Sequence, residues 1–449
     1  MPSVTLQSGD EPAPDQESTH TMATSEISTT ALPGDPTDAA PAPAPHMRRM
    51  SFGLLLVYVA ILAVNSGGNG ILLPNIVAGI DEAGKIGNLA IVTTVVFIAN
   101  VFAQPVAGAL SDATRSRFGR RTPWMVGGAL LTSGFLVGLP MAQSVLTVAL
   151  VWLVVQVGVN ALQAAATAVV PDRYPAARRG GVSAMIGVGI TIGNAVGVAV
   201  AGSTATQGAL PYVVLAVLVL VLVGAFVLVN RDEPSTHLPR ERTGAREFLR
   251  GFWVSPRQHP DFAWAFLSRF LMVIGFYGAQ TYGLYILRDY IGLGDEESNA
   301  FAATMGIVLL VGVLVSASGS GWLSDRVGRR KPFIVWSSVV MAIALAVPLL
   351  VPTTTGILVY AFLLGLGFGT YISIDLALMT EVLPARLGGS SAGRDLAILG
   401  LATTLPQAMS PSIAAGLVTL TGGYPVLFVS GIVFVMLGAV AIRPVKAVR

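Results

Sequence analysis

The sequence contains no cysteine, and only 11% of its 449 residues are charged. The absence of cysteine excludes disulfides, thiol catalysis and cysteine-ligated metals. The histidines all lie outside the long apolar runs, where they could not form a catalytic or metal-binding cluster: His20, His46, His237 and His259. No glycine-rich segment has the context of a phosphate-binding loop. We therefore expect no enzyme, no metal site and no bound cofactor.

Apolar residues are abundant instead, at 53% of the chain. A soluble protein of this size could not bury so much apolar surface, so its solvent is a membrane. Twelve runs of about 20 residues are each long enough to cross ~30 Å of hydrocarbon as a helix. They span 52–76, 87–110, 124–143, 146–169, 182–203, 209–230, 262–287, 300–322, 332–351, 355–380, 395–419 and 424–443. The sequence predicts an all-α integral membrane protein with twelve transmembrane helices.

The basic residues predict the orientation of these helices. All but three of the 27 Lys and Arg fall in the terminal segments or in the loops after even-numbered runs, the exceptions being Lys85, Arg269 and Arg288. Because basic loops stay inside, both termini are expected in the cytoplasm of a multi-pass protein of the cell membrane. This topology explains the excess of basic over acidic residues, so no nucleic-acid partner is expected. We expect a monomer whose partners are the lipid bilayer and a small-molecule substrate.

Two hydrophilic segments divide the chain. Residues 1–47 are acidic and rich in Pro, Ala, Ser and Thr, which is typical of a disordered cytoplasmic tail. Residues 231–261 form the longest internal hydrophilic segment, with clustered Arg and Pro. This predicted cytoplasmic linker separates two six-helix bundles, at 48–230 and 262–449.

Two loops repeat in corresponding places of the two halves. Gly108 to Trp124 reads GALSDATRSRFGRRTPW, and Gly321 to Phe333 reads GWLSDRVGRRKPF. A second pair, Pro171 to Gly181 (PDRYPAARRGG) and Glu381 to Gly389 (EVLPARLGG), follows the fourth and tenth runs. Unrelated basic loops would share arginines but not the matched Gly, Ser, Asp and Pro. Duplicated halves of a transporter produce such parallel repeats.

The paired Asp–Arg loop resembles that of the major facilitator superfamily of secondary transporters. The longer form, S-D-x-T-R-S-R-F-G-R-R, is similar to its sucrose and glycoside–cation symporter branches. The resemblance implies two bundles that rock about a central site. It also implies that Asp112 meets the start of the 395–419 helix, and Asp325 the start of the 182–203 helix, when the cytoplasmic side is closed. The expected cytoplasmic gating residues are Asp112, Arg120, Arg121, Asp172, Asp325, Arg329, Arg330 and Glu381, although some loop arginines serve only topology.

Asp375 is the only acidic residue well inside an apolar run. A charge at that depth is costly unless it is paired or faces water. Arg269, in a run of opposite direction, lies at a comparable depth, so we expect the two side chains to face each other. One interpretation is that Asp375 takes up and releases a proton during transport. The other, equally open, is a permanent structural ion pair.

Polar side chains also occur on the helices that the resemblance places around the central cavity. Amides and phenols there could bind a polyol, or simply bond across helices. The substrate-binding candidates are Asn65, Asn69, Asn160, Gln163, Tyr277, Gln280 and Tyr371. The first run offers no acidic residue, a departure from sugar–proton symporters that leaves the coupling ion, a proton or another cation, open. The sequence favours proton-coupled symport of a sugar or similar small polar solute, with proton-antiport efflux of amphiphilic compounds or a non-transporting sensor as alternatives.

Overall fold

The structure is a computed structural model that describes residues 45–232, 234–236, 260–327, 330–382 and 392–445. Two compact units divide the chain at residue 45: Met1–Ala44 lies outside the described residues, and Pro45–Arg449 contains all of them. Most of the predicted disordered tail, up to residue 44, and most of the predicted linker therefore fall outside the described part. The first helix begins at Pro45, earlier than the apolar run itself.

The described residues are helical and contain no strand. The first six predicted runs correspond to α1 (Pro45–Gly67) with η1 (Gly68–Leu72) and α2 (Leu73–Ile80), α3 (Lys85–Ala113), α4 (Thr122–Gly138) with η2 (Leu139–Met141), α5 (Val145–Arg173), α6 (Ala176–Thr204) and α7 (Leu210–Val229). The last six correspond to α9 (Pro260–Thr281) with α10 (Gly283–Tyr285) and η3 (Ile286–Tyr290), α11 (Asp295–Val327), α12 (Lys331–Leu350), α13 (Thr354–Val382), α14 (Ala392–Thr421) and α15 (Pro425–Ala441).

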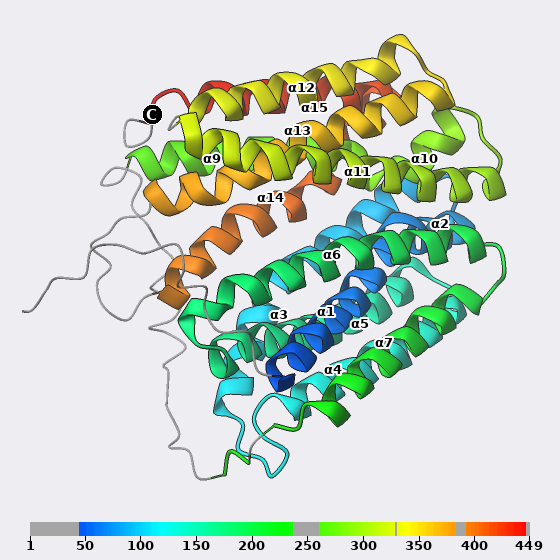
Figure 1. Ribbon diagram of the computed structural model, residues 1–449. Helices are drawn as coiled ribbons and strands as arrows, with labels where there is room; N and C mark the ends of the chain where they lie inside the picture. The colour runs from blue at the N-terminus through cyan, green and yellow to red at the C-terminus, as the bar shows by residue number, and fades with distance from the viewer. Residues whose placement is uncertain (1–44, 233, 237–259, 328–329, 383–391, 446–449) are drawn as a thin grey trace, which may run out of the picture. The chain divides into compact units, whose positions relative to one another are not determined.

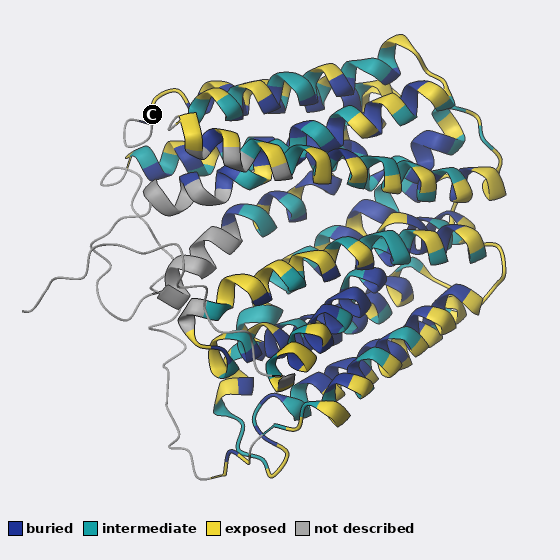
Figure 2. Cartoon of the chain, viewed as in Figure 1, coloured by how far each residue is buried: buried dark blue, intermediate teal, exposed yellow. Residues whose placement is uncertain are grey.

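The chain is built to sit in a membrane. By length and composition, ten helices of the described part can cross one, and α15 is a shorter apolar helix. Together with α14, these helices correspond one to one with the twelve predicted runs. Large apolar side chains such as Phe102, Leu130 and Trp336 remain more than half exposed, and exposed positions run along the outer helices in Figure 2. Lipid is the solvent that suits such surfaces.

The first run of each half is not one regular helix. The sequence predicted continuous helices over 52–76 and 262–287, whereas the structure breaks the first with the five-residue π-helical segment η1 and the second at Tyr282, with the π-helical segment η3 at its end. Glycines accompany each break, at Gly67, Gly68 and Gly70 in the first and at Gly283 in the second. Glycine lacks the side chain that holds a helix to one regular path, and π segments often mark functional positions.

Glycines also bring particular helices into close contact. A Cβ atom at Gly189, Gly193 or Gly197 of α6 would lie only 2.5, 2.7 or 2.2 Å from a backbone carbonyl oxygen of α1. In the second half, a Cβ at Gly365 or Gly369 of α13 would lie 2.2 or 2.5 Å from a carbonyl oxygen of α11. No larger residue fits at these separations without moving the helices.

Most helix contacts stay within one half. In the first, α1 packs on α6 and α7, and α5 packs on α3 and α4. In the second, α13 packs on α11 and α12, and α9 packs on α14 and α15. The main contacts between the halves join α3 to α14 and α6 to α11 (Figure 1).

Ion pairs place the ends of the helices relative to one another. Lys85, at the start of α3, pairs with Asp289, and the neighbouring Arg288 pairs with Asp295 at the start of α11. α3 and α11 therefore begin at one end of the bundle, here called the Asp289 end. Both are long enough to cross, so they finish at the other, the Asp112 end. The two repeated loops thus lie at the same end.

Candidate functional site

A charged pair lies inside the second half, between α9 and α13. Nη1 of Arg269 is 2.9 Å from Oδ2 of Asp375. The hydroxyl of Tyr371, one turn earlier on α13, donates a hydrogen bond to Oδ1 of Asp375 at 2.9 Å. Asp375 is only 3% exposed, so its charge is compensated by these neighbours rather than by solvent. The structure thus brings together three of the residues that the sequence analysis singled out.

The guanidinium of Arg269 contacts more than Asp375 and retains hydrogen-bonding capacity. Its Nη2 donates to Oγ1 of Thr403 on α14 at 2.5 Å. Its buried Nη1 makes no hydrogen bond, because it lies close to the Asp375 oxygen without pointing an N–H bond at it. The contact is a Coulomb attraction without the two parallel hydrogen bonds of a fork-shaped arginine–carboxylate pair.

The pair lies well inside the helices. Arg269 is nine residues after the start of α9, and Asp375 is seven residues before the end of α13. At ~1.5 Å per residue, these positions are roughly 14 and 11 Å from the Asp112 end. The similar depths, which the sequence predicted from helix direction alone, allow the two side chains to meet.

Two of the substrate-binding candidates in the first half bond to neighbouring side chains of α5. Oδ1 of Asn65 accepts a hydrogen bond from Nε2 of Gln156 at 3.1 Å. Oδ1 of Asn69, in η1, accepts one from the indole of Trp152 at 3.3 Å. A ligand would compete with these bonds for the amide oxygens.

Asn160 on α5 donates 2.7 Å hydrogen bonds to Oδ1 of Asn100 and to the carbonyl oxygen of Gln156. Asn100, on α3, was missed by the sequence analysis, although it is an amide well inside an apolar run. Gln163, one turn beyond Asn160, is half-buried. These contacts hold α3 and α5 together and leave the ligand role of both candidates a prediction.

The aromatic candidates of the second half lie beside stacked rings. Tyr277 is hydrogen-bonded to Gln407, and its ring meets that of Phe276 edge-on, 5.0 Å between centroids. Phe276 stacks on Phe368 at 3.8 Å. Gln280, by contrast, borders a separate cavity of about 10 Å³, which holds at most one water. Tyr277 therefore lies in an aromatic cluster, whereas Gln280 borders a cavity too small for a solute.

A larger hollow of about 580 Å³ lies away from all of these residues. It opens between α4 and α5 and is lined by apolar side chains and glycines, among them Gly127, Leu130 and Phe135. It contains no charged or hydrogen-bonding side chain, and it lies on a surface that faces lipid. We assign it no part in the site.

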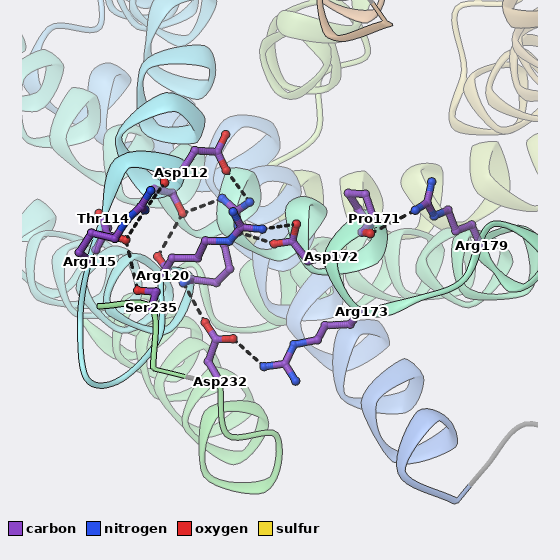
Figure 3. Close-up of polar contacts among 12 residues, drawn as sticks. Asp112, Thr114, Arg115, Arg120, Pro171, Asp172, Arg173, Arg179, Asp232 and Ser235 are labelled. Carbon is purple, nitrogen blue, oxygen red and sulfur yellow. Dashed lines mark hydrogen bonds and ion pairs between the residues drawn. The ribbon is translucent and has the colours of Figure 1, made fainter. Parts of the chain in front are cut away.

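Arg121 holds together the turn between α3 and α4, where Figure 3 shows Asp112, Arg120 and Asp172. Its guanidinium lies 2.5 Å from Asp112 and 2.9 Å from Asp172 of α5, and it donates a 3.0 Å hydrogen bond to Ser111. Arg120 makes a second pair with Asp172 at 2.6 Å. Four of the predicted gating residues thus form one network, and every pair in it stays within the first half.

The chain beyond α7 joins the same network, which the sequence analysis did not foresee. Asp232 accepts a 2.6 Å bond from Arg173 and a 3.0 Å bond from the backbone N–H of Arg121. Ser235 bonds to the backbone of Ser116 in both directions. Figure 3 shows Asp232 and Ser235 beside the turn. The only sequence signal was an acid immediately after an apolar run.

The second copy of the loop is only partly described. Residue Arg329 and the side chains of Asp325 and Glu381 lie outside the described residues, as does the side chain of Arg394. Arg330 is described and is half-buried. The predicted contacts of Asp112 with α14 and of Asp325 with α6 therefore stay predictions.

The Asp289 end joins the two halves directly. Nζ of Lys85 is 2.8 Å from Asp289 and also pairs with Glu82 at 2.6 Å. The hydroxyl of Tyr285 donates to the carbonyl oxygen of Pro74 at 2.9 Å. The sequence analysis treated Lys85 only as an exception to the basic-loop pattern, whereas the structure makes it, with Asp289, an ion pair between the halves.

Comparison with known proteins places these features in context. A sequence profile described as "Major Facilitator Superfamily" matches residues 55–394 and 319–448. Among curated proteins, "MFS transporter asaE" of Aspergillus flavus is 32% identical over 127 residues, which are 28% of this chain and 29% of that protein. The chain matches less than a third of the length of each such relative.

Solved structures share the fold at low identity. A bacterial homologue of the human lysosomal transporter Spinster, in an inward-facing and occupied conformation, has a TM-score of 0.68 and 14% identity, covering 90% of this chain and 97% of its own. A D-xylose–proton symporter has a TM-score of 0.63 and 15% identity, with the same two coverages. At such identities the likeness concerns the fold alone.

Proposed function

We propose, from the premise that this chain belongs to the major facilitator superfamily, that it carries a small polar solute across the membrane together with a proton. Such transporters expose a central site alternately to the two sides by rocking their halves. The observation that carries the proposal is the buried Asp375 held by Arg269 and Tyr371. A carboxylate buried at membrane depth is the group most suited to take up and release a proton as its surroundings change.

The contacts between the halves support a two-state cycle. Lys85 and Asp289 join the halves at one end, while Arg121 and its carboxylates stay within the first half at the other. We take the Asp112 end to be cytoplasmic, as the basic loops predict. In the alternate state Lys85 and Asp289 would separate, and Asp112 would instead meet the start of α14. An exchange of contacts worth a few kcal/mol is enough to set such an equilibrium.

The polar and aromatic substrate-binding candidates support a polar solute. Asn65, Asn69 and Asn160 supply amides in the first half, and Tyr277 lies beside a stacked pair of rings in the second. Aromatic faces and amide edges together suit a sugar or a similar ring bearing polar groups. The name of the D-xylose–proton symporter, which shares the fold, is consistent with this class.

Purified full-length chain in proteoliposomes tests the proposal. Radiolabelled sugars and other small polar solutes are offered with an imposed proton gradient, acidic outside. Accumulation that collapses when a protonophore dissipates the gradient supports proton symport. Movement of amphiphilic dyes against the gradient would instead support antiport efflux, and binding without flux would support a sensor. Either of the last two results contradicts the proposal.

A further inference from the structure

The charge balance inside the second half depends on one pair of side chains. Arg269 and Asp375 contact each other, and their other described partners are the hydroxyls of Thr403 and Tyr371. Among the charged side chains that the structure describes on α9, α11, α12 and α13, no third one contacts either member of the pair. The charged residues of α14, Arg394 and Asp395, have side chains outside the described ones.

Proton uptake by Asp375 removes the only counter-charge that Arg269 has among the described side chains of α9, α11, α12 and α13. An arginine does not give up its own proton, so the positive charge stays. The Arg269 side chain is only 12% exposed, and water compensates a charge poorly at that burial. A neutral solute would leave the charge unbalanced. A solute that brings a negative charge would restore the balance.

The guanidinium also has hydrogen-bonding capacity to offer. One of its terminal nitrogens serves Thr403, and the buried Nη1 makes no hydrogen bond. A carboxylate can take two parallel N–H bonds from such a fork, an arrangement that the present pair with Asp375 lacks. Of the two side chains, that of Arg269 is the more exposed, 12% against 5%.

We propose that the transported solute bears a carboxylate, which binds Arg269 in exchange for Asp375 when that carboxyl takes up a proton. The proposal rests on the proton symport proposed above and names the substrate class of the same site. One proton and one solute anion bind together, so the loaded site carries the same net charge as the empty one. On the far side Asp375 loses its proton and pairs with Arg269 again, which expels the anion.

The first test compares acids with neutral partners of the same shape. Binding of lactate and lactamide, nicotinate and nicotinamide, and galacturonate and galactose to the purified full-length chain is measured at pH 5.5 and pH 7.5 by thermal stabilisation. At pH 5.5, at least one acid should bind about tenfold more tightly than its neutral partner, since a charge-assisted contact is worth that much. The same acid should bind more weakly at pH 7.5 than at pH 5.5. A panel in which no acid is preferred, including one in which none binds, overturns the proposal.

Variants connect this preference to the two residues. Arg269→Gln should abolish it, whereas Arg269→Lys should keep it in weakened form because the charge remains without the fork. Asp375→Asn mimics the protonated carboxyl, so its acid preference should persist and lose its dependence on pH. Glu297→Gln, an exposed acid at the start of α11, is the control and should behave as the unaltered chain. Retention of the acid preference in Arg269→Gln overturns the assignment.

Flux measurements separate this proposal from the function on which it rests. Proton-driven accumulation of galactose without any acid would leave proton symport standing and overturn the carboxylate class. If an acid binds in the expected way but its flux does not depend on the proton gradient, the carboxylate class stands and proton symport is overturned. Proton-driven accumulation of an acid, lost in Arg269→Gln, supports both.

Discussion

Nζ of Lys85 lies 2.8 Å from Oδ2 of Asp289, although 204 residues separate them in the chain. Lys85 begins α3 in the first half, and Asp289 lies in η3 of the second. Lys85 is buried, pairs also with Glu82, and lies 5.1 Å from the centre of the Tyr285 ring. An ion pair that spans two halves, with its cation buried, holds them together at one end.

Removing one member of this pair should favour separation of the halves there. We expect Asp289→Asn to shift the equilibrium toward the open Asp289 end by roughly 2 kcal/mol, about 30-fold, because Lys85 loses its partner across the interface. The chain has no cysteine, so spin labels can be placed without background at Gln207→Cys and Thr421→Cys, two exposed positions at that end in opposite halves. The label-to-label distance should lengthen in the variant. An unchanged distance, equal to that of Glu297→Gln, would show that the Lys85–Asp289 pair does not hold the halves together.

Arg121 should matter more than a neighbouring loop arginine. It is 6% exposed and holds both Asp112 and Asp172, so Arg121→Gln leaves two carboxylates close together without their shared cation. We expect a loss of roughly 2 kcal/mol in thermal unfolding, between the values for surface and buried pairs because Asp112 is partly exposed. Arg117→Gln is the matched control, since Arg117 is exposed and lies against the ring of Phe118. Equal losses in the two variants would show that the ion pairs of Arg121 do not contribute to the stability of the protein.

The glycine contacts between α1 and α6 make a prediction about packing. Gly197→Ala would place a Cβ 2.2 Å from the carbonyl oxygen of Ala63, so the helices must move apart. Overpacking of this kind should cost about 1–3 kcal/mol, measured as a lower thermal unfolding midpoint in detergent. Gly187→Ala, on the same helix with open space around its Cβ, should be neutral or slightly stabilising. If Gly187→Ala lowered the unfolding midpoint more than Gly197→Ala, the close contact of Gly197 with Ala63 would not explain the loss of stability.

The sequence predicted the helices because hydrophobicity and basic loops are properties of the chain itself. The twelve runs, the shared end of the repeated loops and the similar depths of Arg269 and Asp375 all followed from local patterns and helix direction. The break at η1 and the π-helical segment η3 did not, since nothing in the hydrophobic pattern distinguishes a π-helical turn from an α-helical one. Glycines marked the positions without showing that the helix would widen there.

The contacts between distant residues were harder to anticipate. Asn100 and Asn160 meet only because α3 packs on α5, and Asp232 reaches the Arg121 turn only because the chain folds back after α7. Lys85 and Asp289 each carried an ordinary topological meaning in the sequence. Three-dimensional packing gave them partners that no spacing along the chain encodes.

The same difficulty applied to the ligand candidates. Composition alone grouped Gln280 with Tyr277, yet Gln280 borders a cavity too small for a solute. Tyr277 lies instead beside the stacked rings of Phe276 and Phe368. Which face of a helix a polar side chain occupies depends on its neighbours, and these are known only once the helices are placed.

The most direct measurement compares driven accumulation with simple exchange in Asp375→Asn. A carboxamide cannot carry a proton, yet it can still accept the hydrogen bond from Tyr371, so the variant should exchange solute across proteoliposomes and fail to accumulate it under an inward proton gradient. Uphill accumulation by Asp375→Asn, with the pH dependence of the unaltered chain, would show that the proton travels elsewhere.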